Sequence, residues 1–308
     1  MAELPTRTKP CGSLVKVAPD LAGSHATNPS APAHPAAREH PPVGRAHALL
    51  SGSFVACGVR IDIAGFDNSV EAILDAPDRG GRAVHLCNAY TLSLARKDPA
   101  FAAALNQGDL NLPDGKPLAV LGGRLGLPRS ERVCGPDLMA AVLDRGRSRG
   151  LRHYLYGSTP GTIERLTGRI ETLYPGVEIV GAESPPFRPL TADEREALIE
   201  RVRAADPHVV WVGLGTPKQD HFVAEFRDEL GATLVAVGAA FDFLAGLKPR
   251  APQLLQRLGL EWAFRLATEP RRLWRRYLVG NASFVRGLLQ DWRSADGFQA
   301  RRIEAEER

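Results

Sequence analysis

The run HVVWVGLGTPKQDHFVAEFRDE fills residues 208–229 and contains one complete unit of the expected architecture. Its first part, His208–Val212, is short, apolar and β-branched, as is typical of a buried strand. Residues 213–217 include two glycines and a proline, which favour a tight turn. Apolar residues then recur at helical spacing over Asp220–Glu229. A buried strand that leads through a short turn into a helix indicates a parallel α/β sheet.

The same alternation of short apolar strands and helical patterns extends over residues 54–237. Strands are predicted at Phe54–Ile63, as one strand or a hairpin, and at Ala83–Cys87, Leu110–Leu112, His153–Tyr156, Val177–Val180, His208–Val212 and Thr233–Val237. Helices are predicted at Ser69–Ala76, Thr91–Leu105, Lys116–Leu125, Pro136–Arg147, Gly161–Leu173, Thr191–Ala204 and Asp220–Glu229. We therefore predict a Rossmann-like α/β fold whose mostly parallel sheet carries helices on both faces.

The two ends of the chain differ from this core, which we place at residues 51–248. Residues 1–50 are rich in proline, alanine and histidine without an apolar period, so we predict a disordered leader there. Over residues 249–308 apolar residues alternate with arginines, which predicts a basic amphipathic helical appendage. Ten basic and three acidic residues give Lys248–Arg293 a charge of +7, against +4 for the whole chain. Such localised charge predicts an anionic partner.

Several features that the sequence lacks narrow the class of protein. No stretch approaches the roughly 18–20 apolar residues of a membrane span, and no basic head precedes an apolar run at the N-terminus. The four cysteines are scattered without a CxxC pair, which argues against a disulfide framework or a structural zinc site. We expect a cytoplasmic protein without a metal or another cofactor, which contacts a membrane only peripherally.

Polar or glycine-rich loops follow four of the predicted strands, at residues 88–91, 113–116, 157–161 and 213–219. Because parallel strands end at the same edge of a sheet, we expect these loops to converge where such sheets bind ligands. They supply the candidate site residues Asn88, Thr91, Asp114, Lys116, Gly157, Gly215 and Gln219.

Asp114 lies in a Pro-Asp-Gly turn, and its spacing alone fits either an ordinary turn residue or a general base. A carboxylate within hydrogen-bond reach of an acceptor hydroxyl takes its proton as that oxygen becomes nucleophilic. The loops at 157–161 and 213–219 likewise fit either tight turns or phosphate-cradling loops. Neither loop is the GxGxxG of a dinucleotide site or the GxxxxGK[ST] of a P-loop.

The chain has no Asp-x-Asp pair, which many nucleotide-sugar transferases use to hold a divalent ion against the diphosphate. Without such a pair, arginines or backbone dipoles must neutralise the charge of the leaving diphosphate. The basic C-terminal region supplies arginines for this purpose.

Six blocks of sequence, taken in order, resemble the WecG/TagA/CpsF family of bacterial glycosyltransferases. The resemblance covers about residues 55–290. The blocks are Asn88-Ala89, Leu112–Gly115, Glu131–Asp137, Gly213–Asp220, Val237–Asp242, and Leu260–Arg265 through Glu269–Arg272.

This resemblance implies an inverting, metal-independent transfer of a hexose from a UDP-sugar to a sugar linked to polyprenyl diphosphate, in the synthesis of cell-surface polysaccharides. The hexose would be N-acetylmannosamine, its uronic acid or a related sugar. Asp114 matches the family's proposed base, Asn88 its active-site asparagine and Gln219 the glutamine of its GxGxPxQ block. The family's arginines near the donor diphosphate fall by spacing on Arg265, Arg272 and Arg275.

The resemblance also implies that the appendage docks on the cytoplasmic face of the membrane, and it leaves a homo-oligomer open. One position departs from the family's pattern, because Leu86 stands where family members often carry threonine. A hydroxyl contact to the substrate would be lost there, so the resemblance does not fix the donor sugar.

Other interpretations of the same residues stay open. The arginine-rich segment fits a solvated basic face, a nucleic-acid patch or a membrane-surface helix, and the aromatic and leucine residues between the arginines favour the membrane, with no nucleic acid as partner. An oxidoreductase would need GxGxxG after the first strand and an acidic residue about 20 positions later, and neither is present. A non-catalytic module that binds sugar nucleotides or a membrane remains the alternative to an enzyme, and it would tolerate the loss of Asp114.

Overall fold

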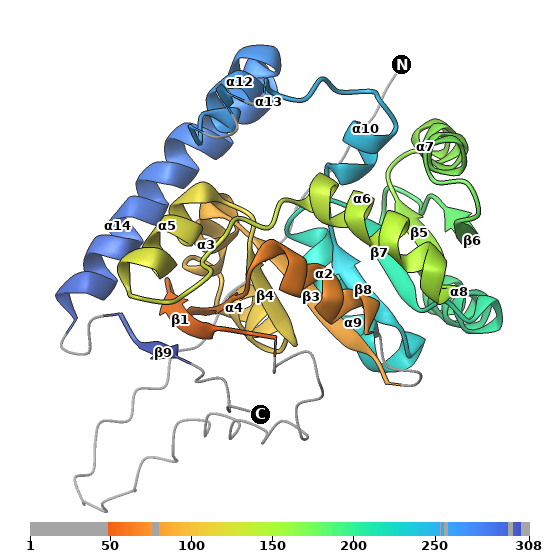
Figure 1. Cartoon of the computed structure of the whole chain (residues 1–308), viewed down its shortest axis with the longest axis horizontal. Helices are drawn as coiled ribbons and strands as arrows, with labels where there is room; N and C mark the ends of the chain where they lie inside the picture. The colour runs from red at the N-terminus through yellow and green to blue at the C-terminus, as the bar shows by residue number, and fades with distance from the viewer. Residues whose placement is uncertain (1–48, 76–79, 253, 256–257, 295–297, 303–308) are drawn as a thin grey trace, which may run out of the picture. The chain divides into compact units, whose positions relative to one another are not determined.

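A computed structural model describes residues 49–75, 80–252, 254–255, 258–294 and 298–302 (Figure 1). The predicted leader at residues 1–50 therefore lies outside the described residues, apart from Leu49 and Leu50. The core contains a six-stranded sheet in the order β4-β3-β8-β7-β5-β6, and all neighbouring strands pair in parallel. Its strands are β3 (Arg82–Cys87), β4 (Leu110–Pro113), β5 (Arg152–Gly157), β6 (Glu178–Glu183), β7 (Val209–Gly213) and β8 (Thr233–Ala236).

Helices cover both faces of this sheet, which confirms the predicted fold class. One face packs against α2 (Phe66–Leu74), α6 (Gly135–Gly146), α7 (Pro160–Leu173) and α10 (Ala240–Leu244). The other face packs against α8 (Ala192–Ala205) and α9 (Lys218–Leu230). Val209 and Trp211 of β7 face the first layer, whereas Val210 and Val212 face the second. A strand buried on both faces needs apolar side chains at every position, which explains the unbroken apolar run of β7.

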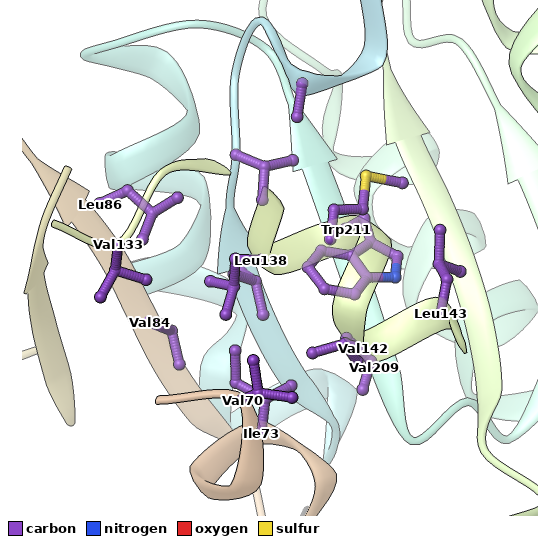
Figure 2. Packing of buried hydrophobic residues seen from close by; sticks show 14 of the residues in the cluster. Val70, Ile73, Val84, Leu86, Val133, Leu138, Val142, Leu143, Val209 and Trp211 are labelled. Carbon is purple, nitrogen blue, oxygen red and sulfur yellow. The ribbon is translucent and has the colours of Figure 1, made fainter. Parts of the chain in front are cut away.

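Trp211 is the largest side chain that is completely buried in the core. Figure 2 shows its indole ring beside Leu138, Val142 and Leu143, which belong to α6. Its Nε1 donates a hydrogen bond to His153 Nδ1 at 3.3 Å. Burial of the indole therefore leaves its polar atom satisfied, as a buried tryptophan requires.

A small antiparallel sheet lies beside the core, built from β1 (Gly52–Ala56), β2 (Val59–Ile63) and β9 (Ala300–Arg302). The hairpin alternative for residues 54–63 is confirmed. The turn residues Cys57 and Gly58 both have positive φ angles, 52° and 76°, and such turns match the twist of a hairpin. Strand β9 corrects the expectation that only helices follow residue 249. Its three residues are exposed and lack an apolar signal, so pairing with β1 defines the strand.

The helix predicted over Thr91–Leu105 is instead two helices, α3 (Ala89–Ala95) and α4 (Pro99–Asn106). The first helix ends at Ala95, and Asp98 caps the second, because its side chain accepts hydrogen bonds from the backbone N–H groups of Ala100 and Phe101. Proline at the first position of α4 disfavours helical backbone at the residue before it. The Asp-Pro pair therefore overrides a continuous apolar spacing.

The C-terminal segment forms α12 (Glu261–Thr268), α13 (Pro270–Trp274), a π-helical turn (Arg275–Val279) and α14 (Gly280–Arg293). The predicted succession of helices is thus confirmed, and Pro270 marks a boundary as expected. Helix α14, drawn in blue in Figure 1, packs along α3. Gly287 allows α14 to approach the turn between β1 and β2, since a Cβ there would lie 2.6 Å from Cys57 Sγ. Within the described residues, no helix combines the length and apolar character needed to cross a membrane.

Candidate active site

A cavity of about 400 Å³ opens where β3, β4, β5, β7 and β8 end. All four loops that the sequence predicted to converge contribute to its wall, which is the position expected for a ligand site in an open α/β sheet. Residues from these loops that line the cavity are Asn88, Asp114, Ser158, Thr159, Gly213, Leu214, Gly215, Thr216 and Gln219. Of the other candidates from these loops, Thr91 is buried beneath Asn88, and Lys116 lines a second cavity described below.

Asn88 and Asp114 form the polar centre of the cavity. Asn88 caps α3, because its Oδ1 accepts hydrogen bonds from the backbone N–H groups of Tyr90 at 3.0 Å and Thr91 at 3.2 Å. The cap leaves the Asn88 amide nitrogen to donate to Asp114 Oδ2 at 3.1 Å. A short turn between β4 and α5 (Lys116–Arg124) holds Asp114, whose side chain is 25% exposed. Its carboxylate thus keeps a fixed orientation and access to a ligand.

Arg132 also contacts Asp114, although the sequence offered no spacing that singled it out. Its Nε donates to the Asp114 carbonyl oxygen at 2.5 Å, and its Nη2 lies 3.9 Å from Asp114 Oδ1. Its Nη1 donates to Glu261 Oε2 at 2.8 Å. Arg132 lies within the Glu131–Asp137 block, so the block carried the only signal that could have found it.

The glycine-rich loop after β7 is held by Gln219, whose side chain is 4% exposed. Its Oε1 accepts a hydrogen bond from the backbone N–H of Gly215 at 3.0 Å. Gly215 has φ of +78°, a left-handed conformation that favours glycine. Gly157 has another role: a Cβ there would lie 2.6 Å from the backbone of Gly213. Gly157 therefore allows β5 and β7 to approach at their ends, while its neighbour Ser158 faces the cavity.

Two arginines of the C-terminal helices reach this site. Arg265 and Arg276 line the cavity, and the Nε atoms of both are buried without a hydrogen-bond partner among the described residues. The Arg276 guanidinium lies over the ring of Tyr90 at 4.5 Å, and burial lowers its pKa. Arg275 is exposed and stacks on Trp274 at 5.2 Å instead. The side chain of Arg272 lies outside the described part of the structure.

Arg276 lies eleven residues after Arg265, but on a different helical segment: Arg265 belongs to α12 and Arg276 to the π-helical turn. The break at Pro270 lies between them, and sequence spacing alone does not show how these irregularities add up.

A second cavity of about 550 Å³ adjoins the first and is mainly apolar. It lies between α3, α5 and the C-terminal helices. Both cavities are lined by Asn88, Asp114, Arg132, Glu261, Arg265 and Arg276. The apolar wall of the second includes Val120, Leu258, Trp262, Tyr277, Phe284, Val285 and Leu288. Asp114 therefore lies where a polar cavity meets an apolar one.

Phe187 is a further residue that the sequence did not indicate. It lines the first cavity yet is 81% exposed, on a loop with prolines at 185, 186 and 189. Ser184 ties this loop to the neighbouring strand end, because its Oγ donates to the Ser158 carbonyl oxygen at 2.6 Å. A large exposed aromatic ring at the rim of a cavity is suited to contact with a ligand.

This combination defines an α/β enzyme with a ligand site at the strand ends, a positioned carboxylate and cationic groups for an anionic substrate. Residues 54–297 match the Glycosyl transferase WecG/TagA/CpsF family, so the chain belongs to that family and is a glycosyltransferase. A relative from Bacillus spizizenii, N-acetylglucosaminyldiphosphoundecaprenol N-acetyl-beta-D-mannosaminyltransferase, is 34% identical over 185 residues. These residues cover 60% of this chain and 70% of the relative. The resemblance inferred from the six sequence blocks is confirmed.

Proposed function

We propose that this glycosyltransferase moves a hexose from a UDP-sugar to a sugar linked to polyprenyl diphosphate, with Asp114 as the base. One observation carries the proposal: Asp114 lies at the junction of a polar cavity and an apolar cavity. The polar cavity suits the donor, since it is lined by glycine-rich loops and two arginines. The apolar cavity suits an acceptor that carries a hydrocarbon chain.

The reaction follows from this placement. An acceptor hydroxyl hydrogen-bonds to Asp114 and attacks the anomeric carbon of the donor, while the bond from that carbon to the UDP oxygen breaks. Asp114 takes the hydroxyl proton, because the oxygen becomes acidic as it forms the new bond. Attack from the face opposite the leaving group inverts the anomeric centre. UDP leaves with an additional negative charge, which Arg265 and Arg276 are placed to stabilise.

The same arginines support the proposal that no metal ion is required. Guanidinium groups bind phosphate oxygens through charge-assisted hydrogen bonds and stabilise the charge that a divalent ion would otherwise balance. Full activity is therefore expected in an excess of chelator, and strict dependence on magnesium or manganese would contradict this part of the scheme.

The name of the Bacillus relative states that it acts on an undecaprenol-linked acceptor and transfers N-acetylmannosamine. This supports a polyprenyl acceptor and an N-acetylmannosamine-like donor for the present chain. We further propose a peripheral position on the cytoplasmic face of the membrane, because the acceptor's hydrocarbon chain is anchored there and the basic C-terminal helices form one wall of the apolar cavity.

The test compares Asp114→Asn with Asp137→Asn, which changes a half-exposed aspartate that pairs with Arg250 at 2.7 Å and lies outside both cavities. Product formation from UDP-N-acetylmannosamine and a short-chain polyprenyl-diphosphate acceptor is followed by mass spectrometry, and UDP binding by calorimetry. Asp114→Asn should bind UDP normally and lose at least about 100-fold in kcat, since general bases contribute on that order. Asp137→Asn should remain within about twofold of the unchanged enzyme.

Normal turnover by Asp114→Asn would refute the base assignment. UDP binding by the unchanged protein without transfer to any polyprenyl-diphosphate acceptor would instead support the non-catalytic alternative. A screen of UDP-hexoses, with the product linkage determined by NMR, then identifies the donor.

A further inference from the structure

Two carboxylates from distant parts of the chain share one guanidinium. Arg132 donates to Glu261 at 2.8 Å, whereas its nearest approach to the Asp114 carboxylate is 3.9 Å, beyond hydrogen-bond distance. Arg132 and Glu261 are mostly buried, with side chains 22% and 16% exposed. Glu261 is the first residue of α12, while Asp114 and Arg132 belong to the α/β core. The contact therefore joins the C-terminal helices to the group proposed as the base.

Which of the two carboxylates pairs with the Arg132 guanidinium affects how Asp114 can react. A guanidinium released from one carboxylate is free to pair bidentately with another within reach, and such pairs are the strong ones. Pairing of this kind favours the charged form of a carboxylate, which makes the carboxylate a weaker base. Glu261 holds Nη1, so the nearer Asp114 oxygen stays free for an acceptor hydroxyl.

Other groups around Asp114 do not replace this contact. Asn88 donates to the opposite carboxylate oxygen, Oδ2. The thiol of Cys134 lies 3.3 Å from Arg132 Nη2, and burial raises its pKa, so this thiol stays neutral. Burial likewise raises the pKa of the Cys87 thiol. The remaining charged groups that line the cavities with Asp114 are the cations Lys116, Arg265 and Arg276 and the carboxylate of Asp242, which pairs with Lys248 at 2.5 Å.

We propose that Glu261 is a positioning residue that holds Arg132 away from Asp114 and so couples the docking of α12 to the basicity of the catalytic carboxylate. Arg265 lies one turn after Glu261 on the same helix. Docking of α12 therefore delivers a cation for the leaving diphosphate and releases the base in one event. Without α12, Arg265 would be absent from the site and Arg132 would be free to pair with the Asp114 carboxylate. The inference rests on the proposed function, with Asp114 as the base.

The test compares Glu261→Gln and Glu261→Asp with Glu269→Gln in the full-length enzyme. Glu269 is an acid of the same helical segment, 3.6 Å from Lys248, and it lines neither cavity. kcat and the KM for the UDP-sugar are measured between pH 4.5 and 9. We expect Glu261→Gln to lower kcat at least about tenfold and to move the acid limb of the kcat profile to lower pH, because the freed guanidinium stabilises the charged carboxylate. Glu261→Asp keeps the charge on a shorter side chain, so its kcat and its pH profile should lie between those of Glu261→Gln and the unchanged enzyme. Glu269→Gln should match the unchanged enzyme.

A different pattern would overturn the inference. If Glu261 only anchors α12, Glu261→Gln raises the KM for the donor while the pH profile does not move. Unchanged kcat in Glu261→Gln would also refute it. Thermal unfolding of each variant separates either outcome from a folding defect, and Glu261→Asp remains informative if the Gln variant is unstable. Failure of the proposed function is recognised separately, as normal turnover by Asp114→Asn.

Discussion

The buried Nε atoms of Arg265 and Arg276 have no hydrogen-bond partner among the described residues. A buried charged donor without a partner is costly, and an anionic ligand in the adjoining cavity would supply the missing acceptor. Arg275, which sequence spacing favoured, instead stacks on Trp274. The structure therefore predicts that Arg276 binds the anionic ligand, whereas the sequence spacing predicts its neighbour Arg275.

Arg276→Ala and Arg275→Ala test that difference directly. Loss of a hydrogen bond to a charged group costs about 1.5–3 kcal/mol, so Arg276→Ala should lower kcat/KM for the UDP-sugar roughly 10- to 150-fold. Arg275→Ala should lower it less than about threefold. Steady-state kinetics with a fixed, saturating acceptor give both values. A larger loss from Arg275→Ala than from Arg276→Ala would favour the assignment by spacing.

Individual residues also mark the limit of what the sequence could predict at the site. Asn88, Asp114 and Gln219 follow strands, and parallel strands end at one edge, so their convergence was predictable. Arg132 and Glu261 are separated by 129 positions, and only the tertiary structure brings them together.

At the scale of elements, the order of strands and helices in the core was predictable because both kinds of element carry a clear apolar period. The sequence-based prediction of elements failed where a local or a distant contact determines the structure in place of the apolar period. Asp98 and Pro99 divide a helix in spite of its continuous apolar spacing. Strand β9 has no apolar period at all and depends on pairing with β1.

His153 of β5, which accepts a hydrogen bond from Trp211 of β7, makes the stability of the protein depend on pH. Burial, and to a lesser extent the nearby His208, lowers the pKa of His153 from 6.5 to about 4. The unfolded chain therefore binds a proton on this histidine at a higher pH than the folded protein does. The contribution of neutral His153 to the free energy of unfolding is present above pH 6.5 and is lost as the pH falls toward 4. The loss is at most about 3 kcal/mol.

Urea unfolding at several values between pH 4.5 and 7.5 measures this effect. His153→Gln keeps an acceptor for the Trp211 N–H and removes the titrating group, so its unfolding free energy should fall less than that of the unchanged protein over this range. His221→Gln, at an exposed histidine, should retain the full dependence. Parallel pH profiles for the unchanged protein and His153→Gln would show that His153 is not responsible.

At the scale of the whole molecule, the apolar cavity continues into an exposed apolar surface on α14. Val285, Leu289 and Trp292 follow one another at helical spacing on one face, and Trp292 is 67% exposed. Arg286 and Arg293 lie beside them. An apolar stripe flanked by cations suits the surface of an anionic membrane, and Val285 also lines the cavity proposed for the acceptor. One surface would thus hold the enzyme where a polyprenyl chain enters the active site.

This arrangement predicts that the enzyme binds anionic vesicles through α14. The double variant Leu289→Ser/Trp292→Ser should bind phosphatidylglycerol vesicles at least about tenfold more weakly in a sedimentation assay, because burial of each apolar side chain contributes roughly 1.5–3 kcal/mol. Leu173→Ser, on the distant helix α7, removes an exposed leucine without changing that surface and should bind normally. Binding of the unchanged protein should also weaken at high salt, since arginines contribute. The variant should keep its activity on a water-soluble, short-chain acceptor and lose activity on a long-chain acceptor in vesicles, since only the second reaction requires the membrane. Equal vesicle binding by all three proteins would exclude α14 as the membrane contact and leave the role of Asp114 unaffected.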